Sequence, residues 1–288
     1  MSRSRPRRGR RGLWLLAVLA ALALFFWDQQ TRIQPEEYVI QAAGLPEAFD
    51  GLRIVQISDL HGGLPGDGDF RRLLAAVEAQ EPDLIAVTGD LIDRAEQMER
   101  MGALARALAA IAPTYYVTGN HEWAVRRVPE LKELLARAGV TVLSNEFVTL
   151  ERDGARLVVA GIDDPNGPAD QKTGLELLEE VRAAEGADVY TVLLAHRDKV
   201  YTYDAWGYDL TLCGHGHGGI FRVPVLDRGV LGTDRNLFPE IDGGLYRYTS
   251  GKCCVVSRGL GSNTTPIHAF RLFNRPHLPV VVLRSAEI

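Results

Sequence analysis

Short apolar runs rich in β-branched residues alternate along the chain with stretches that have the spacing of amphipathic helices. The runs with the length and composition of buried strands are 52–57, 84–88, 115–118, 157–162, 189–194 and 209–212. Apolar residues recur at helical spacing in 70–80, 95–111, 129–138 and 173–184. This alternation of strands and helices predicts an α/β fold.

Residues typical of helix ends stand at the ends of the predicted helices. Asp69 is a natural N-cap for the first predicted helix, Asp67 belongs to the loop before it, and Gly139 is a natural stop for the third helix. No internal repeat or low-complexity segment follows residue 40. We therefore expect a linker over residues 28–40 and one catalytic-size domain over residues 41–288.

Residues 13–27 form an unbroken apolar run that ends in Phe25, Phe26 and Trp27. As a helix the run would span about 22 Å, against a hydrocarbon core of roughly 30 Å. It could be a cleaved export signal, an uncleaved signal-anchor or a buried core helix. We favour the signal-anchor, because the best small-residue cleavage pattern, 21–23, lies inside the apolar run instead of after it.

Positive charge is concentrated on the N-terminal side of this run. Six arginines fall in the first eleven residues, without an acidic residue. This bias predicts a cytoplasmic tail over residues 1–12 and a catalytic domain outside the cytoplasm. Paired arginines also occur in twin-arginine export signals, but the residues that usually follow them are missing here.

The amino-acid composition excludes several classes of protein. Hydrophobic residues make up 46% and charged residues 24% of the 288-residue chain, which argues against a disordered, collagenous or multi-span membrane protein. Taking the six arginines from the 32 basic residues leaves 26 against 37 acidic residues, so we expect no nucleic-acid partner. The three cysteines exclude a disulfide framework and a four-thiolate zinc site. They are expected to pack in the core, although Cys253 and Cys254 could oxidise if they were exposed.

Polar clusters follow five of the six predicted strands. They are Asp59-Leu60-His61, Gly89-Asp90-Leu91-Ile92-Asp93, Gly119-Asn120-His121-Glu122, His196 and Gly214-His215-Gly216-His217. In open α/β sheets, ligands bind beyond the carboxyl ends of the strands. Five of the seven histidines should therefore converge at one edge.

These residue types indicate metal binding. Aspartate, asparagine and histidine, without a thiolate, suit divalent Mn, Fe or Zn. Seven candidate ligands are too many for one tetrahedral site, whereas two divalent metal ions sharing a carboxylate would use them all. Such pairs, about 3.5 to 4 Å apart, are a standard device for in-line attack on phosphorus.

The five blocks, in this order, resemble those of the calcineurin-like metallophosphoesterases: D-x-H, G-D-x-x-D, G-N-H-[DE], H and G-H-x-H. The likeness extends from about Leu52 to the C-terminus, and is greatest to a bacterial membrane-associated branch that includes UDP-diacylglucosamine pyrophosphatases and related phosphodiesterases. It implies a four-layer αββα sandwich, in which two mixed β-sheets pack face to face between layers of helices.

The resemblance also implies a role for each residue. One metal would be held by Asp59, His61, Asp90 and His217, and the other by Asp90, Asn120, His196 and His215. Asp90 would bridge the metals, and a bridging hydroxide would be the nucleophile. His121 would face the phosphoester and protonate the leaving oxygen or stabilise charge, with Asp93 orienting its ring.

Some residues depart from the family pattern. Gly216 and Ile220 stand where this branch commonly has threonine and glutamine, which puts a polar substrate contact in doubt. His268 stands where relatives often carry arginine. Asp93 argues against the purple acid phosphatases, which place a tyrosine ligand in the second block.

Other polar residues are assigned structural roles. Asp163 and Asp164 are predicted to form a turn; the alternative is that one of them contacts the substrate or a metal ligand. His268 and His277 are predicted to be surface or packing residues. The 219–248 segment could form a lid, and its apolar residues available for that purpose are Phe221, Phe238, Leu245 and Tyr246.

The sequence thus predicts a membrane-anchored, two-metal phosphoesterase that hydrolyses a phosphoester or pyrophosphate bond. The anchor favours a lipid-linked substrate, although the family precedent acts at the cytoplasmic leaflet and the arginine bias places this domain on the other side. The alternative is a non-catalytic metal-binding adaptor on the same fold. Intact His121 and Asp93 argue against it.

Overall fold

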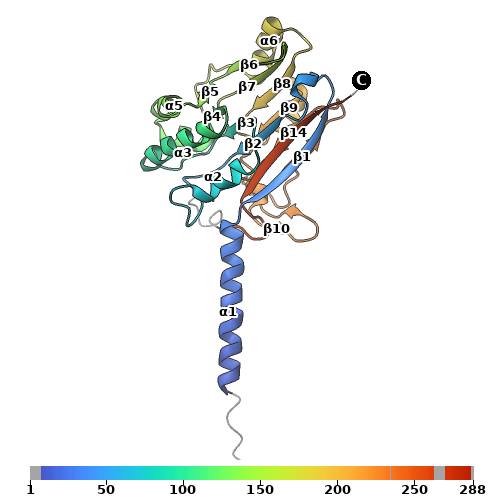
Figure 1. Cartoon of the computed structure of the whole chain (residues 1–288). Helices are drawn as coiled ribbons and strands as arrows, with labels where there is room; N and C mark the ends of the chain where they lie inside the picture. The colour runs from blue at the N-terminus through green and yellow to red at the C-terminus, as the bar shows by residue number, and fades with distance from the viewer. Residues whose placement is uncertain (1–7, 234, 263–269, 287–288) are drawn as a thin grey trace, which may run out of the picture.

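Two six-stranded sheets lie face to face in the body of the protein, and a long N-terminal helix projects from it (Figure 1). The computed structural model describes residues 8–233, 235–262 and 270–286. His268 lies outside the described residues, as do residues 1–7 of the basic tail.

The first sheet has the order β1-β14-β2-β3-β4-β5. Its strands are β1 (Gln34–Ala42), β14 (His277–Ser285), β2 (Arg53–Ile57), β3 (Leu84–Thr88), β4 (Thr114–Val117) and β5 (Thr141–Val142). Only the β14-β2 pair is antiparallel in this sheet. The carboxyl ends of β2, β3 and β4 therefore share one edge.

The second sheet has the order β12-β13-β9-β8-β7-β6. Its strands are β12 (Gly244–Arg247), β13 (Cys253–Val256), β9 (Leu210–Cys213), β8 (Tyr190–Leu194), β7 (Ala155–Gly161) and β6 (Glu146–Arg152). The outer pairs are antiparallel and the inner strands are parallel. A small hairpin, β10 (Arg222–Val223) and β11 (Arg228–Gly229), lies apart from both sheets.

Helices cover the outer faces of the two sheets. The helices α2 (Arg71–Glu78), α3 (Met98–Ile111) and α5 (Val128–Arg137) share a core with β2 and β3. The helices α6 (Gly174–Glu185) and α7 (Val200–Trp206) share a core with β7 and β8. A third apolar cluster lies between the sheets and includes Ile54, Leu84, Val159 and Leu212. The predicted four-layer sandwich is therefore confirmed.

The six predicted strands each lie within two residues of an observed strand, and the four predicted helices are present. The helix predicted over 95–111 starts with a 3₁₀ turn, η2 (Ala95–Gln97), before α3. Gly139 follows α5 with a φ of +96°, as a stop residue should. The three cysteines are buried, which confirms that they pack in the core and leaves Cys253 and Cys254 unexposed.

The capping of α2 differs from the prediction. Asp67, not Asp69, accepts the backbone N–H groups of Arg72 and Leu73, both at 3.1 Å. Asp69 instead pairs with Arg71 at the surface. The chain makes a left-handed turn at Phe70, with a φ of 59°, and this turn carries the Asp67 carboxylate to the helix terminus.

The segment predicted as a linker, residues 28–40, instead forms the end of a helix and most of a strand. Helix α1 extends over Arg8–Thr31 and β1 begins at Gln34, so only Arg32 and Ile33 separate them. Strand β1 pairs with β14 in parallel over its whole length, from Gln34↔His277 to Ala42↔Ser285. Residues 34–40 therefore belong to the catalytic body. By length and composition, residues 12–31 of α1 could cross a membrane, with a mean hydropathy of 1.7.

His277 is fully buried at the start of β14, as a packing residue. Its Nδ1 atom accepts the backbone N–H of Arg258 at 3.0 Å, so its proton lies on Nε2, 3.3 Å from a Glu36 oxygen. Burial lowers the pKa of His277 to about 4, against the attraction of Glu36. The native fold thus holds this imidazole neutral.

This histidine should make stability depend on pH. Between pH 6.5 and about 4, His277 takes a proton in the unfolded chain but not in the folded one, so the free energy of unfolding falls as pH falls, by about 3 kcal/mol in all. We expect urea unfolding with a chelator present to show this slope, and His277→Asn, which cannot be protonated, to reduce it. Equal slopes for the two proteins would contradict the assignment.

Candidate metal centre

All of the predicted ligands lie at one edge of the sandwich, directly after strands. Asp59 and His61 follow β2, Asp90 follows β3, Asn120 follows β4, His196 follows β8, and His215 and His217 follow β9. The strands come from both sheets, so the site lies across the interface between the two layers.

The backbone at this edge is held in an uncommon conformation. Asp59, His61, Asp90, His215 and His217 have φ values between 48° and 73°, in the left-handed region. Non-glycine residues in this region are strained and often belong to functional sites. The strain is maintained by close packing of the turns around these residues.

Two glycines in the motif blocks show how tight this packing is. A Cβ atom on Gly89 would lie 2.5 Å from the Gly119 backbone nitrogen. A Cβ atom on Gly214 would lie 2.0 Å from Ser58 Oγ and 2.3 Å from Asp59 Oδ2. The glycines are therefore needed because the loops after β3, β4 and β9 approach their neighbours without space for a side chain.

One half of the site gathers Asp59, His61 and His217. The Nε2 atoms of His61 and His217 lie 3.0 Å apart, and His217 Nε2 lies 3.5 Å from Asp59 Oδ1. His61 Nδ1 lies 2.6 Å from Asp93 Oδ1. Since a carboxylate only accepts, the proton of neutral His61 lies on Nδ1, and its Nε2 lone pair faces the centre.

The other half gathers Asn120, His196 and His215. His196 Nδ1 donates to the Thr88 carbonyl at 2.9 Å, so the Nε2 lone pair of neutral His196 also faces the centre. This Nε2 atom lies 3.1 Å from Asn120 Oδ1 and 3.2 Å from His215 Nδ1. The backbone carbonyl thus orients the ring in the way that protein groups commonly orient metal-binding histidines.

Asp90 joins the two halves through one atom. Its Oδ2 lies 3.3 Å from His196 Nε2 and 3.9 Å from both His61 Nε2 and His121 Nε2. Its other oxygen accepts the backbone N–H of His121 at 2.8 Å. The Asp90 carboxylate therefore lies between the two halves of the site.

The donor set fits divalent cations. Three groups have potential ligand atoms within 4.8 Å of one another: Asp59, His61 and His217; Asp90, His196 and His215; and His61, Asp90 and His121. Carboxylate oxygens and imidazole nitrogens converge there, and the Nε2 atoms of neutral His61 and His196 present lone pairs to the centre. A cation satisfies such a set because its positive charge compensates the buried carboxylates.

The pKa shifts describe the same charge balance. Burial raises the pKa of Asp59. Burial would also raise the pKa of Asp90, but the charges of His196, His61 and His121 and the His196 hydrogen bond together outweigh burial and lower that pKa. Burial would lower the pKa of His196, but Asp90 and Asp59 raise it to about 10, so a cation has to replace that proton for His196 to be a ligand. Burial lowers the pKa of His215 to about 2 and that of His217 well below its ordinary value. The last two imidazoles are thereby kept neutral, as metal ligands must be.

His121 and Asp93 form a pair beside this centre. His121 lies in the first turn of α4 (Asn120–Val125), and its side chain is 29% exposed. Its Nδ1 lies 2.7 Å from Asp93 Oδ1. Burial would lower the His121 pKa, but this bond and the charges of Asp90, Asp93 and Glu122 together outweigh burial and raise it. Asp93 also binds His61, so a single carboxylate orients one predicted ligand and the predicted acid.

Glu122 is a residue of the third block to which sequence reasoning gave no role. Its buried carboxylate accepts the backbone N–H groups of Gly119, Asp90 and Leu91 at 2.7, 3.0 and 2.6 Å. Burial, followed by the charge of Asp90, raises its pKa to about 7. Glu122 therefore joins the loops after β3 and β4. The acidic residue after Asn120-His121 was the signal for this role.

Arg197 was also missed, and Asp164, which was assigned chiefly to a turn, holds it. The Asp164 carboxylate accepts Arg197 Nε at 2.7 Å, and Arg197 Nη1 donates to His215 Nε2 at 3.1 Å. The neighbouring Asp163 accepts Thr118 Oγ1 at 2.7 Å and also pairs with Lys132. These aspartates are buried and specifically paired, which is more than the turn-forming role predicted for them.

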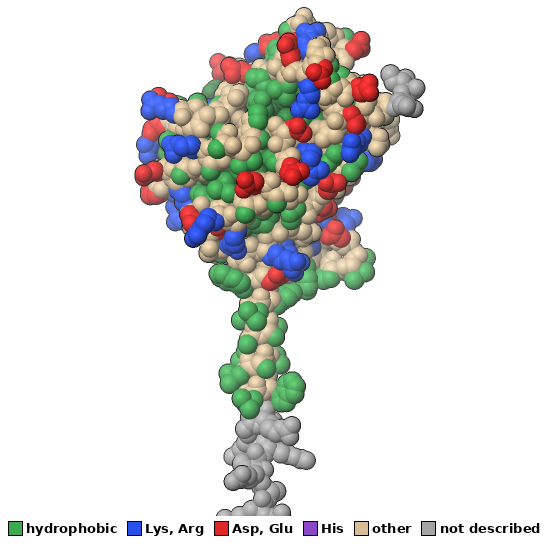
Figure 2. Space-filling view, in the orientation of Figure 1, with side chains coloured by type: hydrophobic (Ala, Val, Ile, Leu, Met, Phe, Trp, Pro, Cys, Tyr) green, Lys and Arg blue, Asp and Glu red, His purple; other side chains and the backbone are tan. Residues whose placement is uncertain are grey.

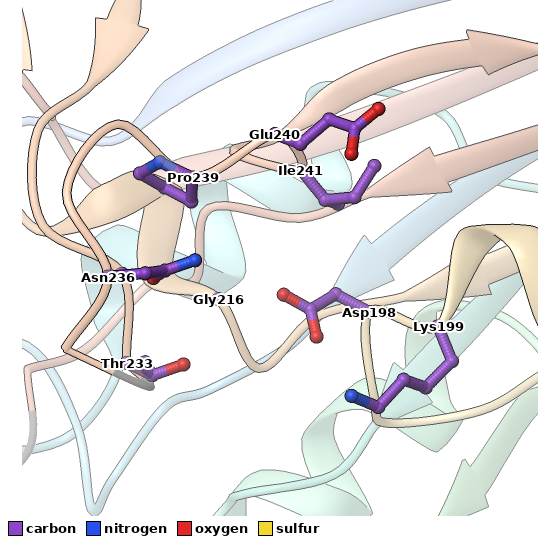
Figure 3. Close-up of a pocket in the computed structure, with 9 residues that line it drawn as sticks. Asp198, Lys199, Gly216, Thr233, Asn236, Pro239, Glu240 and Ile241 are labelled. Carbon is purple, nitrogen blue, oxygen red and sulfur yellow. The ribbon is translucent and has the colours of Figure 1, made fainter.

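A polar cavity of about 170 Å³ lies next to the last histidine block (Figure 3). Asp198 and Lys199 face it from one side, and the loop carrying Thr233, Asn236 and Glu240 faces it from the other. A threonine-like Cβ at Gly216 would lie 2.6 Å from Asp198 Oδ2. Asp198 thus occupies the space that a side chain at position 216 would need.

A second cavity, of about 330 Å³, is mostly apolar and reaches His196. Ile162, Pro165, Tyr203 and Trp206 contribute to its wall.

The 219–248 segment differs from the lid that its apolar residues suggested. Leu245 packs against the core between the sheets, and Tyr246 accepts the Asp242 backbone N–H through its hydroxyl at 2.9 Å. Phe238 is exposed. The part of this segment beside the metal centre is polar.

Comparison with known proteins gives a consistent result. The sequence profile described as Calcineurin-like phosphoesterase matches residues 52–219. An uncharacterized metallophosphoesterase of Aquifex aeolicus is 30% identical, over 94% of this chain and 97% of that protein. A transmembrane protein with metallophosphoesterase domain from Danio rerio is 29% identical, over 95% of this chain and 62% of that protein.

Among solved structures, the NAD nucleotidase of Haemophilus influenzae has a similar fold. The TM-score is 0.50 at 14% identity, over 73% of this chain and 46% of that one.

Proposed function

The chain belongs to the calcineurin-like phosphoesterase family, and we propose that it hydrolyses a phosphoester or pyrophosphate bond at a two-metal centre beside a membrane. Its family membership supports phosphoesterase activity. The observation that carries the two-metal assignment is the position of Asp90 Oδ2, within 3.9 Å of imidazole nitrogens from both halves of the site. The same proposal assigns the metal ligands, the general acid, the substrate class and the membrane anchor.

In this proposal Asp59, His61, Asp90 and His217 hold one cation, and Asp90, Asn120, His196 and His215 hold the other. Two cations bound there would supply the charge that activates water near neutral pH and stabilises phosphoryl oxygens.

The protein's own contribution to the chemistry lies in the His121-Asp93 pair. Asp93 holds the Nδ1 side of the ring at 2.7 Å, so Nε2 points toward Asp90 and the centre. The raised His121 pKa favours a protonated ring that can donate to the leaving oxygen. The polar cavity beside Gly216 would take a polar group of the substrate, and the apolar cavity beside His196 would take an apolar one.

The position of α1 supports a lipid-linked substrate, as in the pyrophosphatase branch that the sequence resembles. Gly66, five residues after His61, packs on Trp27: a Cβ atom at Gly66 would lie 3.4 Å from the indole. On the other side, Asn274 donates to the His217 carbonyl at 2.8 Å, while Arg271 and Gln30 are hydrogen-bonded to each other. The metal centre and the candidate membrane helix therefore lie at the same end of the body.

Metal analysis and turnover test the activity directly. We expect the full-length protein in detergent to hold close to two transition-metal ions per chain and to hydrolyse bis(para-nitrophenyl) phosphate. Chelation should abolish turnover, and added Mn²⁺, Fe²⁺ or Zn²⁺ should restore it. A protein that retains two metals but turns over no phosphoester would support the adaptor instead.

We also propose that α1 is an uncleaved anchor with the arginine-rich end in the cytoplasm. Alkaline phosphatase fused after Ile288 should then be active, and a cytoplasm-dependent fluorescent protein at the same place should be dark. The opposite pattern would place the catalytic body in the cytoplasm. Replacing the six N-terminal arginines by glutamine should weaken the orientation bias and serves as the control.

A further inference from the structure

Exposed apolar side chains surround the place where α1 meets the body. They are Val225, Leu226, Leu237, Phe238, Phe270 and Phe273, and together we call them the apolar collar. Their exposed fractions range from 46% for Phe273 to 103% for Val225. Figure 2 shows hydrophobic side chains gathered at the base of the body, around the top of the stalk. Single exposed apolar residues are ordinary, but a group of this size marks an interaction surface.

Part of the collar lies on a hairpin that is hydrogen-bonded to the loop carrying a predicted metal ligand. Val225 and Leu226 form the tip between β10 and β11, which Figure 1 places beside the upper end of α1. The buried Arg222 side chain holds this hairpin by donating to the carbonyl groups of Gly218 at 3.1 Å and Asp242 at 2.6 Å. Gly218 directly follows His217, so the hairpin is joined to a predicted metal ligand.

The other side of the collar is joined to α1. The rings of Phe25 and Phe273 lie 5.6 Å apart, so the apolar surface of the helix continues onto the body. Asp28 pairs with Arg275, and the backbone of Arg271 donates to Gln30 Oε1 at 2.9 Å. Arg72 also donates to the Thr31 carbonyl at 3.1 Å. The last turns of α1 are thus held against the body, and the collar stays beside them.

We propose that the apolar collar inserts into the interface of the phospholipid bilayer that α1 crosses. The proposal rests on the membrane anchor of the proposed function and deepens it. A helix that crosses the bilayer and is fixed to the body at its end brings the neighbouring loop tips to the level of the lipid headgroups. Apolar side chains at that level are stabilised when they enter the headgroup and acyl boundary.

Such docking would define the substrate class. Asn274 donates to the carbonyl groups of both His217 and Ile220, at 2.8 and 3.1 Å, one residue after Phe273. The metal centre would therefore face the headgroup layer. A phosphoester or pyrophosphate attached to a lipid could reach it while the acyl chains stay in the bilayer. The collar would thus favour lipid-attached phosphoesters, because it would hold the metal centre at the headgroup layer where they lie.

Depth-dependent quenching in vesicles tests the proposal on the full chain. The native cysteines are buried, so a cysteine introduced at an exposed position can be labelled selectively with an environment-sensitive nitrobenzoxadiazole probe. The positions are Leu226→Cys in the collar, Leu19→Cys in α1 and Leu175→Cys in α6. Leu175 is 41% exposed, and Figure 1 shows α6 at the far end of the body from α1. Vesicles of phosphatidylcholine would contain doxyl-labelled phosphatidylcholine as the quencher.

We expect the probes at positions 226 and 19 to be quenched by a factor of about two or more, and the probe at position 175 to be unaffected. Phe238→Cys gives a second collar position if the first variant folds poorly. Quenching at 19, with 226 and 238 behaving like 175, would overturn the collar and leave the anchor intact. No quenching at 19 would overturn both. If the collar probes instead show only contact between two copies of the chain, the collar is a dimer interface and the proposal is wrong.

The same labelled proteins should be assayed with bis(para-nitrophenyl) phosphate. This soluble diester does not depend on membrane docking, so its turnover should be unchanged by the label at position 226. Collar quenching without turnover in any sample would support docking and refute the catalytic part of the proposed function. Failure of membrane docking and failure of the proposed catalytic activity would therefore give different results.

Discussion

Asp90→Asn should lose almost all phosphoesterase activity and release metal from both halves of the site. The Oδ2 atom of Asp90 lies between imidazoles of the two halves, 3.3 Å from His196 Nε2 and 3.9 Å from His61 Nε2. Asparagine keeps the shape but removes the negative charge. It therefore weakens the attraction for two cations at once, and turnover should fall by about 10³ or more.

The measurement is metal content and kcat/KM on the same preparation. Asp67→Asn is the matched control, because Asp67 is also a buried aspartate but caps α2 and belongs to none of the groups with metal-ligand spacing. An asparagine can still cap the helix. The control should keep its metals and activity within a few-fold. If Asp90→Asn kept two metals and full turnover, the shared-ligand assignment would be wrong.

His121→Ala should separate chemistry from metal binding. The ring is held by Asp93 on its Nδ1 side, and its Nε2 atom lies 3.9 Å from Asp90 Oδ2. The structure also permits His121 to be a ligand, because His61, Asp90 and His121 form one of the groups with ligand spacing. We propose that it is the acid, since its ring is the partly exposed one and can reach a substrate oxygen.

The variant should therefore retain both metals and lose about 10² to 10⁴ in kcat. The loss should be larger for an alkyl phosphodiester than for a para-nitrophenyl ester, because a poor leaving group needs the proton most. His61→Ala is the comparison variant, and it should lose metal because His61 lies directly between His217 and Asp90. Metal loss from His121→Ala, or an equal effect on good and poor leaving groups, would show that His121 is a ligand or an electrostatic clamp.

The core strands and helices were predictable because their signals are local. The runs that form β3 and β8 are mostly apolar on both faces, and the sequence has this property before any folding. Strands β1 and β14 were not predicted. They pair across more than two hundred residues, and β1 carries Glu36 and Glu37 within a partly exposed edge strand. Such a strand is stabilised by its partner, and its own sequence gives little sign of it.

The predicted ligands could be named in advance because each follows a strand or a glycine-rich turn, and parallel strands end at a common edge. Roles that depend on distant partners could not be assigned. Glu122 organises loops that start about thirty residues earlier, and Asp164 holds Arg197 beside His215. No spacing rule links these residues in the chain.

By itself, the sequence determined the α/β fold, the apolar N-terminal run and the set of residues with metal-ligand chemistry, because these depend on residue type and short-range periodicity. Only the tertiary structure decided that Asp90 lies between the two halves and that Asp67 caps α2. It also brought the β10-β11 hairpin and Phe273 beside the end of α1. The physical reason is that side chains far apart in the chain become neighbours only when two sheets pack and fix the distances between their loops.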